Sequence, residues 1–345
     1  MQSNEEFVKF IGTGVYGSVD LVKYTRSDGS SFHAAVKSSY AEDYDSLNRE
    51  LQILRELRGR PRIVECLGDY LEEGLSYNGD KVYKLLLEYA SGGNLNDFMD
   101  KHTTTDRKLP DPIIRDFTRM ILEGLVSIHG HGYVHCDLKP ENILVFPCED
   151  WYELKISDFG LSLKVGEVPE YWKIDFPFVG APAYMSPESL KDGVAKKALD
   201  LWSLGCLVLE MYTGVNPWGG VNETVLEVLL FDGKSPVIPE SVPCVAREFI
   251  ETCFARNPEE RGSANDLLSH RFLRREEEKI VADVTTCEER KKSLLLNVKS
   301  RIRQDSMNTL EKPLKSKICQ SKHSQFKKFL GVLLKLWVSN LVTVQ

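Results

Sequence analysis

Two short segments constrain this chain more than any other feature: residues 135–142 (HCDLKPEN) and residues 157–161 (SDFGL). The first contains Asp137, a carboxylate that can accept a proton from an alcohol, and the amide of Asn142. The second contains another carboxylate, Asp158. Amide and carboxylate oxygens suit a hard divalent ion such as Mg²⁺, and phosphoryl transfer needs positioning and charge neutralisation more than covalent chemistry. The two segments therefore predict a site that moves a phosphoryl group from a metal-bound triphosphate to a hydroxyl.

A glycine-rich stretch, IGTGVYGSV, precedes these segments. Its G-x-G-x-x-G spacing is a weak signal, because it also occurs in the Rossmann turn, which leads into a helix. Here VDLVKYT continues as an alternating strand, and Asp28-Gly29 then turns the chain into a third strand, SFHAAVKSS. The pattern predicts a flap over nucleotide phosphates, whose glycines let the backbone approach closely. The residues expected in this flap are Ile11, Gly12, Thr13, Gly14, Val15, Tyr16, Gly17, Ser18 and Val19.

The third predicted strand carries Lys37, and thirteen residues later Glu50 lies in LNRELQILREL, where apolar residues recur at helical spacing. Taken alone, Lys37 has an ordinary explanation as a strand-end lysine, and Glu50 as a solvated helix residue. Together with the glycine stretch and the two catalytic segments in this order, they predict an ion pair that aims the ammonium at the α- and β-phosphates.

From about residue 7 to residue 273 the chain resembles a eukaryotic protein kinase. Residues 186–188 (SPE) resemble the family's A-P-E motif, and Asp200 in DLWSLGC resembles the aspartate that braces the catalytic loop. Arg261 resembles the arginine that pairs with the glutamate of that motif, so an ion pair between Glu188 and Arg261 is expected. Lys139, two residues after Asp137, follows the serine/threonine-kinase pattern.

Several segments are most similar to plant mitogen-activated protein kinase kinase kinases: PRIVECLGD, LLLEYASGGNL, HCDLKPENILVFP, LKISDFGLS and YMSPESL. The resemblance implies an α+β, two-lobed kinase domain over residues 1–275. A small antiparallel β-rich lobe with one key helix would span about 1–88, a hinge 88–90, and a larger, mainly helical lobe about 91–275. It also implies transfer of the ATP γ-phosphate, with Mg²⁺, to a protein substrate, in this subfamily a MAP kinase kinase.

The same resemblance implies roles for particular residues. Asp137 would be the catalytic base, and the remaining catalytic set would be Lys139, Asn142, Lys37 and Glu50. Asn142 and Asp158 would hold the metal. The adenine would lie between apolar side chains, against the hinge backbone, in a pocket made by Ile11, Val19, Ala35, Leu87, Glu88, Ala90 and Leu144.

Three departures from the family pattern stand out. Cys136 occupies the position where many kinases have an arginine that grips a phosphate on the activation loop, and a thiol cannot form that charge-assisted fork. Residues 163–185 contain no serine or threonine, which leaves Ser162, Tyr171 and Tyr184 as the nearby hydroxyls. Ala181 replaces the usual threonine, whose hydroxyl bonds to the catalytic aspartate. Loss of one neutral hydrogen bond costs about 0.5–1.5 kcal/mol, about tenfold in rate at most.

The cysteines and the N-terminus bear on location. The chain has eight cysteines, none in a C-x-x-C pair, and it opens with the polar segment MQSNEE. These features predict free thiols and an intracellular, reducing compartment, the cytoplasm and also the nucleus.

Charge divides the chain near residue 280–290. Residues 291–345 carry 12 Lys/Arg against 2 Asp/Glu, whereas the whole chain has a net charge of −7, so residues 1–290 carry −17. The acidic body argues against a nucleic-acid enzyme. We expect a monomer with a basic tail over residues 276–345.

The tail supports several interpretations. RKKSLLLNV resembles a docking peptide for a downstream kinase, and it equally fits an amphipathic helix on the large lobe. Residues 299–325 are polar and lysine-rich and are predicted to be disordered. The apolar end, residues 329–344, is interrupted by Lys335 and is shorter than the ~20 residues that cross a bilayer. A helix lying on a membrane surface or on a partner protein is therefore favoured over a tail anchor.

Three functions follow from these patterns. The first is an active serine/threonine kinase. The second is a weakly active nucleotide-binding scaffold that recruits cascade partners through its tail. The third is a membrane-tethered signalling kinase. The presence of Lys37, Glu50, Asp137, Asn142 and Asp158 favours the first, because a scaffold usually lacks at least one of them.

Overall fold

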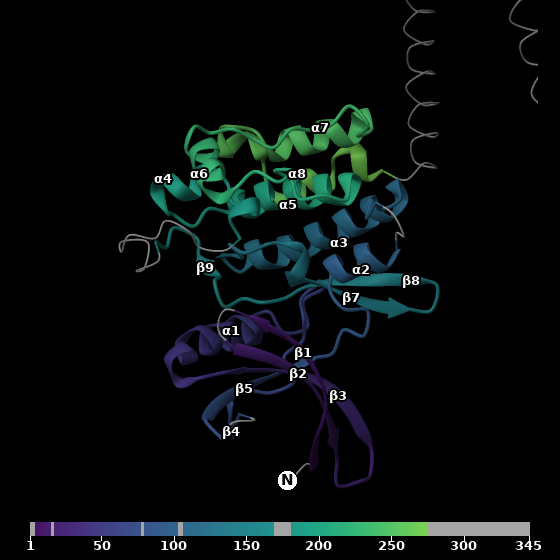
Figure 1. Cartoon of the computed structure of the whole chain (residues 1–345), viewed down its shortest axis with the longest axis vertical. Coiled ribbons are helices and arrows are strands. Elements are labelled where there is room, and N and C mark those ends of the chain that lie inside the picture. Colours follow the sequence, from purple (N-terminus) through teal and green to yellow (C-terminus); the bar gives the residue numbers. More distant parts are fainter. Residues whose placement is uncertain (1–3, 15–16, 77–78, 103–105, 169–180, 275–345) are drawn as a thin grey trace, which may run out of the picture. The chain divides into compact units, whose positions relative to one another are not determined.

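The computed structural model describes residues 4–14, 17–76, 79–102, 106–168 and 181–274 of the 345. These residues form a small lobe built on a β-sheet and a larger, mainly helical lobe (Figure 1). The predicted two-lobed α+β fold is confirmed. The tail predictions concern residues outside the described part of the chain.

The small lobe is a five-stranded antiparallel sheet in the order β1-β2-β3-β5-β4. Its strands are β1 (Asn4–Gly14), β2 (Gly17–Thr25), β3 (Ser31–Ser39), β4 (Glu72–Leu75) and β5 (Lys81–Glu88). The predicted turn at Asp28-Gly29 joins β2 to β3, where Gly29 has a φ of +82°. At the turn into β2, a Cβ on Gly17 would lie 1.8 Å from the carbonyl oxygen of Ser38, so only glycine fits there.

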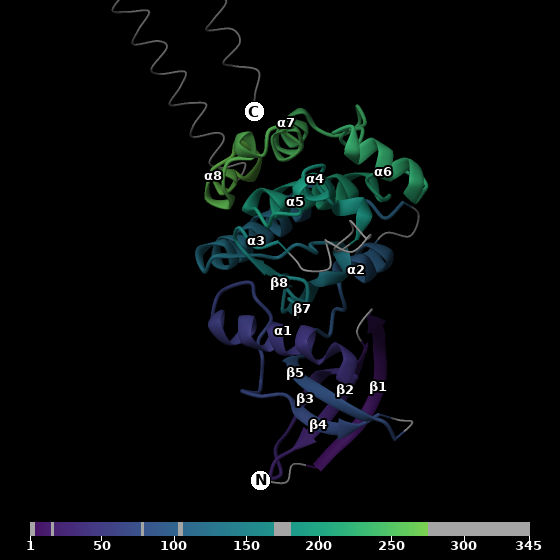
Figure 2. The same ribbon diagram turned by 90° about the vertical axis from the view of Figure 1, so that its left-hand side faces the viewer.

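Helix α1 (Tyr44–Glu56) follows the third strand, after the short 3₁₀ helix η1 (Ala41–Asp43). The residues Leu47, Leu51 and Leu54 recur at helical spacing and are buried, which is why this segment forms a helix with one inward face. Figures 1 and 2 show α1 on the side of the sheet that faces the large lobe. Its buried face places Glu50 toward the site between the lobes.

The large lobe combines helices with two short antiparallel strand pairs. The helices are α2 (Leu95–His102), α3 (Asp111–Gly130), α4 (Ser189–Asp192), α5 (Lys197–Thr213), α6 (Glu223–Phe231), α7 (Cys244–Cys253) and α8 (Ala264–Leu268). The strand pairs are β6 (Tyr133–Val134) with β9 (Leu163–Lys164), and β7 (Ile143–Cys148) with β8 (Trp151–Ile156). The 3₁₀ helices are η2 (Pro140–Asn142), η4 (Pro182–Tyr184), η5 (Pro258–Arg261) and η6 (Arg271–Leu273).

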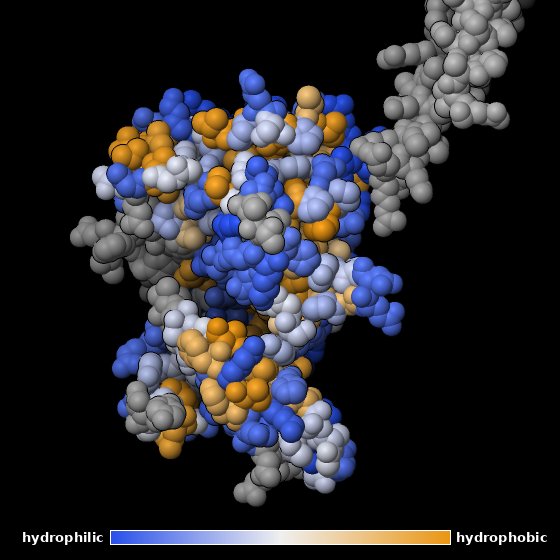
Figure 3. Space-filling view, turned by 45° about the vertical axis from the view of Figure 1, so that its right-hand side comes forward, coloured by the Kyte–Doolittle hydropathy of each residue, from blue (hydrophilic) through white to orange (hydrophobic). Residues whose placement is uncertain are grey.

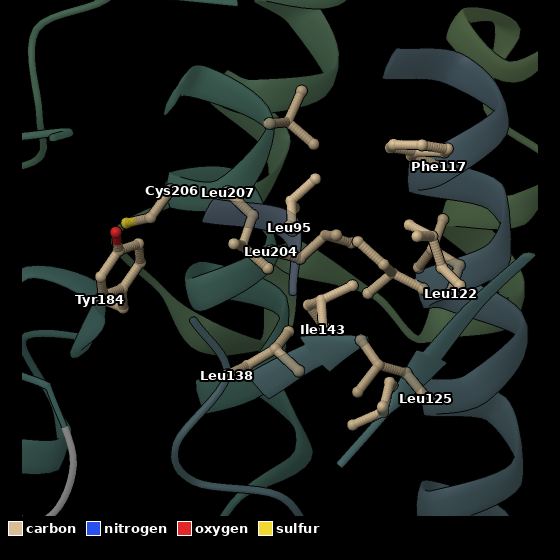
Figure 4. Close-up of a cluster of buried hydrophobic side chains, with 14 of the residues drawn as sticks. Leu95, Phe117, Leu122, Leu125, Leu138, Ile143, Tyr184, Leu204, Cys206 and Leu207 are labelled. Carbon is tan, nitrogen blue, oxygen red and sulfur yellow. The ribbon is translucent and has the colours of Figure 1, made fainter. Parts of the chain in front are cut away.

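Helix α5 runs through the centre of this lobe and is buried from Asp200 to Met211. It ends at Gly214, whose φ is +72° and whose Cβ, if present, would lie 1.8 Å from the carbonyl oxygen of Asp106. Figure 4 shows side chains of α5 packed with those of α2 and α3, with Ile143 of β7 and with Leu138. Because Leu138 lies between Asp137 and Lys139, this core holds the loop of residues 135–139 in place.

The described chain ends on the large lobe. Phe272 of η6 is fully buried, and its ring lies 5.0 Å from that of Phe249 on α7 and 6.4 Å from that of Tyr212 on α5. The guanidinium of Arg115 on α3 lies 5.6 Å from the same ring. Phe272 therefore closes one end of the helical core. Within the described ranges, every helix is too short or too polar to cross a lipid bilayer.

Candidate active site

Lys37 lies between two carboxylates. Its Nζ is 2.7 Å from Oε2 of Glu50 and 2.8 Å from Oδ1 of Asp158. Glu50 comes from α1, Lys37 from β3, and Asp158 from the segment after β8, so the cluster joins the two lobes. The ion pair expected between Lys37 and Glu50 is present, and the contact between Lys37 and Asp158 was not predicted from the sequence.

The Lys37 ammonium and the two carboxylates shift one another's pKa. Burial raises the pKa of the Glu50 carboxyl, and the Lys37 ammonium opposes that shift. Burial also favours neutral Asp158, but the Lys37 ammonium outweighs it and holds the pKa of this carboxyl below its ordinary value. Burial disfavours the Lys37 ammonium, yet Glu50 and Asp158 together raise the pKa of Lys37. Lys37 is therefore cationic at neutral pH, in the state that binds phosphate oxygens.

Helix α1 is held to the large lobe by three further hydrogen bonds. The backbone N–H of Phe159 donates to Oε1 of Glu50 at 3.3 Å, and the Ser46 hydroxyl donates to the carbonyl oxygen of Gly160 at 3.3 Å. The Tyr133 hydroxyl donates to Oε2 of Glu56 at 2.9 Å. These bonds fix the position of Glu50 and therefore of Lys37. Ser46, Glu56 and Tyr133 were missed by sequence reasoning, because their pairing depends on how the lobes meet.

Asp137 is oriented from three sides. Its Oδ2 accepts hydrogen bonds from Nζ of Lys139 at 2.7 Å and from Nδ2 of Asn142 at 3.0 Å, and its Oδ1 accepts one from the backbone N–H of Ala181 at 3.1 Å. Asn142 also donates to the carbonyl oxygen of Asp137 at 2.7 Å. The side chain of Asp137 is buried and hydrogen-bonded, as a base of fixed position requires.

The bond from Ala181 changes one sequence-based expectation. The threonine hydroxyl that usually orients the catalytic aspartate is absent, but the backbone of the same residue supplies a donor instead. Backbone donors have no sequence signature, since every residue except proline has one.

Asp200 on α5 braces the catalytic loop, as its resemblance implied. Its Oδ2 accepts hydrogen bonds from the backbone N–H of His135 at 2.9 Å and from Nε2 of His129 at 2.8 Å, and its Oδ1 accepts one from the backbone N–H of Cys136 at 3.0 Å. Burial alone would raise the pKa of Asp200, but the bond from His129 lowers it below the ordinary value. The brace matters because Cys136 has a φ of +67°, which a residue with a side chain adopts only when the surroundings hold it there.

Asn142 and Asp158 lie at the same end of the β7–β8 hairpin. Asn142 precedes β7, Asp158 follows β8, and the backbone N–H of Ser157 donates to the carbonyl oxygen of Asn142 at 2.9 Å. Nδ2 of Asn142 donates to Asp137. Oδ1 of Asn142 accepts no hydrogen bond from the described residues and is therefore available to a cation. An amide oxygen and a carboxylate oxygen fit Mg²⁺, which takes its remaining ligands from water and phosphates. No larger cluster of His, Cys, Asp and Glu suited to a metal occurs in the described part of the chain.

The predicted nucleotide pocket has its roof in the sheet. Val19 is paired with Lys37 and Gly12, and Ala35 is paired with Leu21 and Leu87, so these positions occupy neighbouring rows of β1, β2, β3 and β5. Figure 3 shows a hollow between the two lobes beside this region. Ile11 is partly exposed in β1, and Ser18 lies in β2. Thr13 and Gly14 end β1, while Val15 and Tyr16 lie outside the described residues.

The floor and the hinge of the pocket lie on the other side. Leu144 of β7 forms a bridge with Asn94. Leu87 is buried, and the Glu88 carboxylate binds Nζ of Lys155 at 2.7 Å, so the side chain of Glu88 is engaged within the protein. The backbone N–H of Ala90 has no acceptor among the described residues, which suits a hydrogen bond to a nucleobase.

Cys136 packs beside an apolar cluster of Val134, Leu163 and Ala195. Burial, and then the negative charge of Asp200, raises the pKa of the Cys136 thiol well above its ordinary value. The thiol therefore acts as a small apolar side chain at this position.

The first part of the segment after SDFGL is held by backbone hydrogen bonds. Strand β9 pairs with β6. The backbone N–H of Gly166 donates to the carbonyl oxygen of Ala195 at 2.8 Å, and the backbone N–H of Ala195 donates to the carbonyl oxygen of Glu167 at 2.9 Å. None of these contacts uses a phosphate. Two of the three nearby hydroxyls are also engaged: Ser162 is buried and donates to the carbonyl oxygen of His135 at 3.1 Å, and buried Tyr184 donates to Oε2 of Glu210 at 2.5 Å. Tyr171 lies outside the described residues.

The expected ion pair between Glu188 and Arg261 is confirmed. Nη2 of Arg261 lies 2.9 Å from Oε2 of Glu188, and Nη1 of Arg261 binds Oε1 of Glu188. Arg261 is fully buried, with its Nε donating to the carbonyl oxygen of Ala255 at 3.1 Å and its guanidinium 5.0 Å from the ring of Trp202. This fixes the segment that follows η4 against the large lobe.

The fold and this arrangement of Lys37, Asp137 and Asp158 define a protein kinase, and residues 6–273 match the family model described as protein kinase domain. The chain therefore belongs to the protein kinase family, and it is a protein serine/threonine kinase. Kinases of this family bind ATP and typically use a divalent metal.

The most similar relatives found are mainly from plants. The chain is 35% identical over 269 residues to mitogen-activated protein kinase kinase kinase 20 of Arabidopsis thaliana, covering 76% of each chain. It is also 35% identical over 263 residues to mitogen-activated protein kinase kinase kinase 17 of the same plant, covering 74% of this chain and 67% of the relative. The yeast serine/threonine-protein kinase BCK1/SLK1/SSP31 is 34% identical over 277 residues, which are 76% of this chain and 18% of the yeast protein. The similarity lies in the kinase domain.

Proposed function

We propose that this kinase is a mitogen-activated protein kinase kinase kinase, which transfers the γ-phosphate of ATP to serine or threonine hydroxyls of a MAP kinase kinase. The relatives with that name support this role. The observation that supports catalysis most directly is Asp137, held by Lys139, Asn142 and Ala181. A scaffold with little turnover would have no need of so many fixed contacts around a single base.

In the proposed mechanism, Asp137 accepts the proton of the substrate hydroxyl, and Lys139 beside it lies where negative charge develops. Lys37, aimed by Glu50, binds the α- and β-phosphates, and the flap of residues 11–19 covers them. Asn142 and Asp158 would hold Mg²⁺, which would neutralise the charge of the phosphates. The apolar rows of the sheet, with Leu144 opposite, hold the adenine, and the Ala90 N–H donates to it.

The test is a phosphorylation assay with ATP and Mg²⁺ on a panel of MAP kinase kinases whose own catalytic lysine has been replaced. Wild-type protein is compared with Asp137→Asn, which keeps the shape of the side chain but removes the base. We expect turnover to fall by several orders of magnitude in the variant while nucleotide binding persists. Near-normal phosphotransfer by Asp137→Asn would refute the assignment of the base. Failure of the wild type on every panel member would refute the proposed substrate class.

We further propose a monomeric enzyme of the cytoplasm and nucleus, with residues 326–345 docking on an anionic membrane surface or on a partner protein. The basic composition of residues 291–345 supports this, because each basic residue near an anionic surface contributes about 1 kcal/mol. The test compares the full chain with a chain lacking residues 326–345, by cell fractionation and by binding to vesicles with and without anionic lipid. Equal behaviour of the two chains in both measurements would exclude a docking role.

A further inference from the structure

Ser46 lies in the first turn of α1, where this helix meets the SDFGL segment of the large lobe. Its side chain is half-buried, and its hydroxyl donates to the carbonyl oxygen of Gly160 at 3.3 Å. A Cβ on Gly160 would lie 2.9 Å from Oγ of Ser46, closer than real Cβ atoms come to other heavy atoms. The contact between α1 and Gly160 therefore leaves no room for a group larger than the Ser46 hydroxyl.

The chain around Ser46 is only loosely held to the small lobe. No side chain from residue 40 to residue 46 is buried, and the first buried residue of α1 is Leu47. Asp43, the N-cap residue, makes no side-chain hydrogen bond to the first turn. A helix end without a cap and without buried side chains opens at a low cost in free energy. The Ser46 hydroxyl can therefore be presented to another enzyme while the rest of the lobe stays folded.

A phosphate on Ser46 would meet negative charge in the present arrangement. Oδ1 of Asp158 lies 3.4 Å from the point that a Cβ on Gly160 would occupy, and Glu50 is one helical turn along α1 from Ser46. The Lys37 ammonium between these carboxylates is already bound to both of them. A phosphoserine carries a charge of about −1.5 to −2 at pH 7, and beside carboxylates this charge is repelled. Its place next to Gly160 is therefore unfavourable in charge as well as in size.

The solvent side of α1 offers such a phosphate a better position. Arg49 lies three residues after Ser46 on the same helix and is exposed. Residues three apart are neighbours on a helix surface, so a phosphate on Ser46 can pair with the guanidinium of Arg49. This pairing draws the phosphate away from Gly160.

We propose that Ser46 is a phosphorylation site and that its modification switches this kinase off. The phosphoryl donor is ATP, used by a separate serine/threonine kinase. The bond from the γ-phosphorus to the β–γ bridging oxygen breaks, a bond from that phosphorus to Oγ of Ser46 forms, the hydroxyl proton passes to the base of the modifying enzyme, and ADP leaves. The carbonyl oxygen of Gly160 loses its donor, and α1 moves away from the SDFGL segment. Glu50 then no longer holds Lys37 beside Asp158.

The effect of the phosphate is measured on the full chain made in bacteria with phosphoserine inserted at position 46. Initial rates on myelin basic protein serve as the readout, because the inference does not depend on the class of the physiological substrate. We expect kcat/KM to fall by about 100-fold and the KM for ATP to rise, since a displacement of about 1 Å in catalytic groups can cost that much. Treatment of the same sample with a phosphatase should restore the rate.

Two matched proteins separate the phosphate from other causes. Phosphoserine at position 30, which is exposed in the turn between β2 and β3 of the same lobe, should leave the rate unchanged within about twofold. Ser46→Ala removes only one neutral hydrogen bond and should lose about tenfold at most. A phosphorylated chain no less active than Ser46→Ala would overturn the switch. A loss that the phosphatase does not reverse would also overturn it, because the cause would then be a damaged fold.

A second measurement tests whether the modification occurs. The full chain carrying Asp137→Asn, which cannot modify itself, is expressed in plant cells, chosen because most of the relatives are plant proteins. It is purified with phosphatase inhibitors, and the tryptic peptide of residues 38–49 is sequenced by mass spectrometry. We expect a fraction of this peptide to carry phosphate on Ser46. A peptide that is unmodified, or that carries phosphate only on Ser38, would refute the assignment of the site.

Discussion

The backbone N–H of Ala181 donates a hydrogen bond to Oδ1 of Asp137 at 3.1 Å, and this bond orients the proposed catalytic base at the position where the family pattern has a threonine hydroxyl. Because the donor belongs to the backbone, the side chain of residue 181 is left with no hydrogen-bonding role. The position therefore offers a direct measure of what a second donor would add.

Ala181→Thr should increase turnover, since a hydroxyl there can add a second hydrogen bond to Asp137. One such bond is worth about 0.5–1.5 kcal/mol, so the gain is at most about tenfold in kcat. Ala181→Val is the matched control, because it has nearly the same shape without the hydroxyl. Initial rates on one peptide at saturating ATP give the comparison. Equal rates for the Thr and Val variants would show that the hydroxyl has no role in this site.

Tyr133→Phe should weaken the hold of the large lobe on α1, because it removes the bond to Glu56. A hydrogen bond to a charged group contributes about 1.5–3 kcal/mol, and only part of that energy affects the position of Lys37. We therefore expect kcat/KM to fall by about tenfold. Tyr212→Phe is the control, since that hydroxyl binds Asp111 within the large lobe. Both variants should melt earlier, but only Tyr133→Phe should raise the KM for ATP. A similar rise in both would attribute the effect to general loss of stability.

Glu50→Gln should separate stability from activity. Burial raises the pKa of Glu50, so the folded protein binds its proton more tightly than the unfolded chain does. The stability that the wild type gains from this group therefore rises as the pH falls through the folded pKa toward the ordinary value of 4.5, and the variant lacks this dependence on pH. Urea unfolding at about pH 7.5 and about pH 5.5 should show that the free energy of unfolding of the wild type increases, relative to that of Glu50→Gln, as the pH falls.

The same variant should lose roughly 10- to 100-fold in kcat/KM, because Lys37 is no longer held in place by an ion pair. A stability difference that stays constant or shrinks as pH falls would contradict the raised pKa. Full activity in Glu50→Gln would contradict the role of Glu50 in positioning Lys37.

Cys136 should resist alkylation in the folded protein. Its raised pKa leaves little thiolate, and the surrounding cluster with Leu163 limits access. Exposed Cys244 is the internal control. Iodoacetamide at pH 8, followed by peptide mass spectrometry over time, should label Cys244 first and Cys136 only after unfolding. Labelling at equal rates would mean that Cys136 is open to solvent.

The kinase should be active without phosphorylation of serine or threonine between Leu163 and Met185, a stretch that contains neither. The buried Ser162 hydroxyl donates to the carbonyl oxygen of His135, and β6 and β9 are held together by backbone hydrogen bonds. Protein from bacteria should therefore keep its initial rate after treatment with a broad phosphatase, with a kinase known to need loop phosphorylation as the positive control. A collapse in rate, restored by phosphorylating Ser162 or a loop tyrosine, would refute this.

The parts that could be predicted from sequence are those in which local pattern and chemistry coincide. The turn at Asp28-Gly29, the helix around Glu50 and the pair between Glu188 and Arg261 each depend on one short motif or on one family motif. The unpredicted parts depend on packing between distant segments. Tyr133 meets Glu56 only because α1 lies against β6, and His129 meets Asp200 only because α3 crosses α5. Hydrophobic periodicity predicts which face of a helix is buried, not which polar group it will find there.

Phe272 has a consequence for how such a chain can diverge. Its ring fills the end of the helical core against Phe249 on α7 and Tyr212 on α5, and the guanidinium of Arg115 on α3 lies 5.6 Å from it. One side chain near the end of the large lobe therefore holds together three helices that are far apart in the sequence. A substitution at position 272 alters the packing of all three helices at once, so this position can change only together with its partners on α3, α5 and α7.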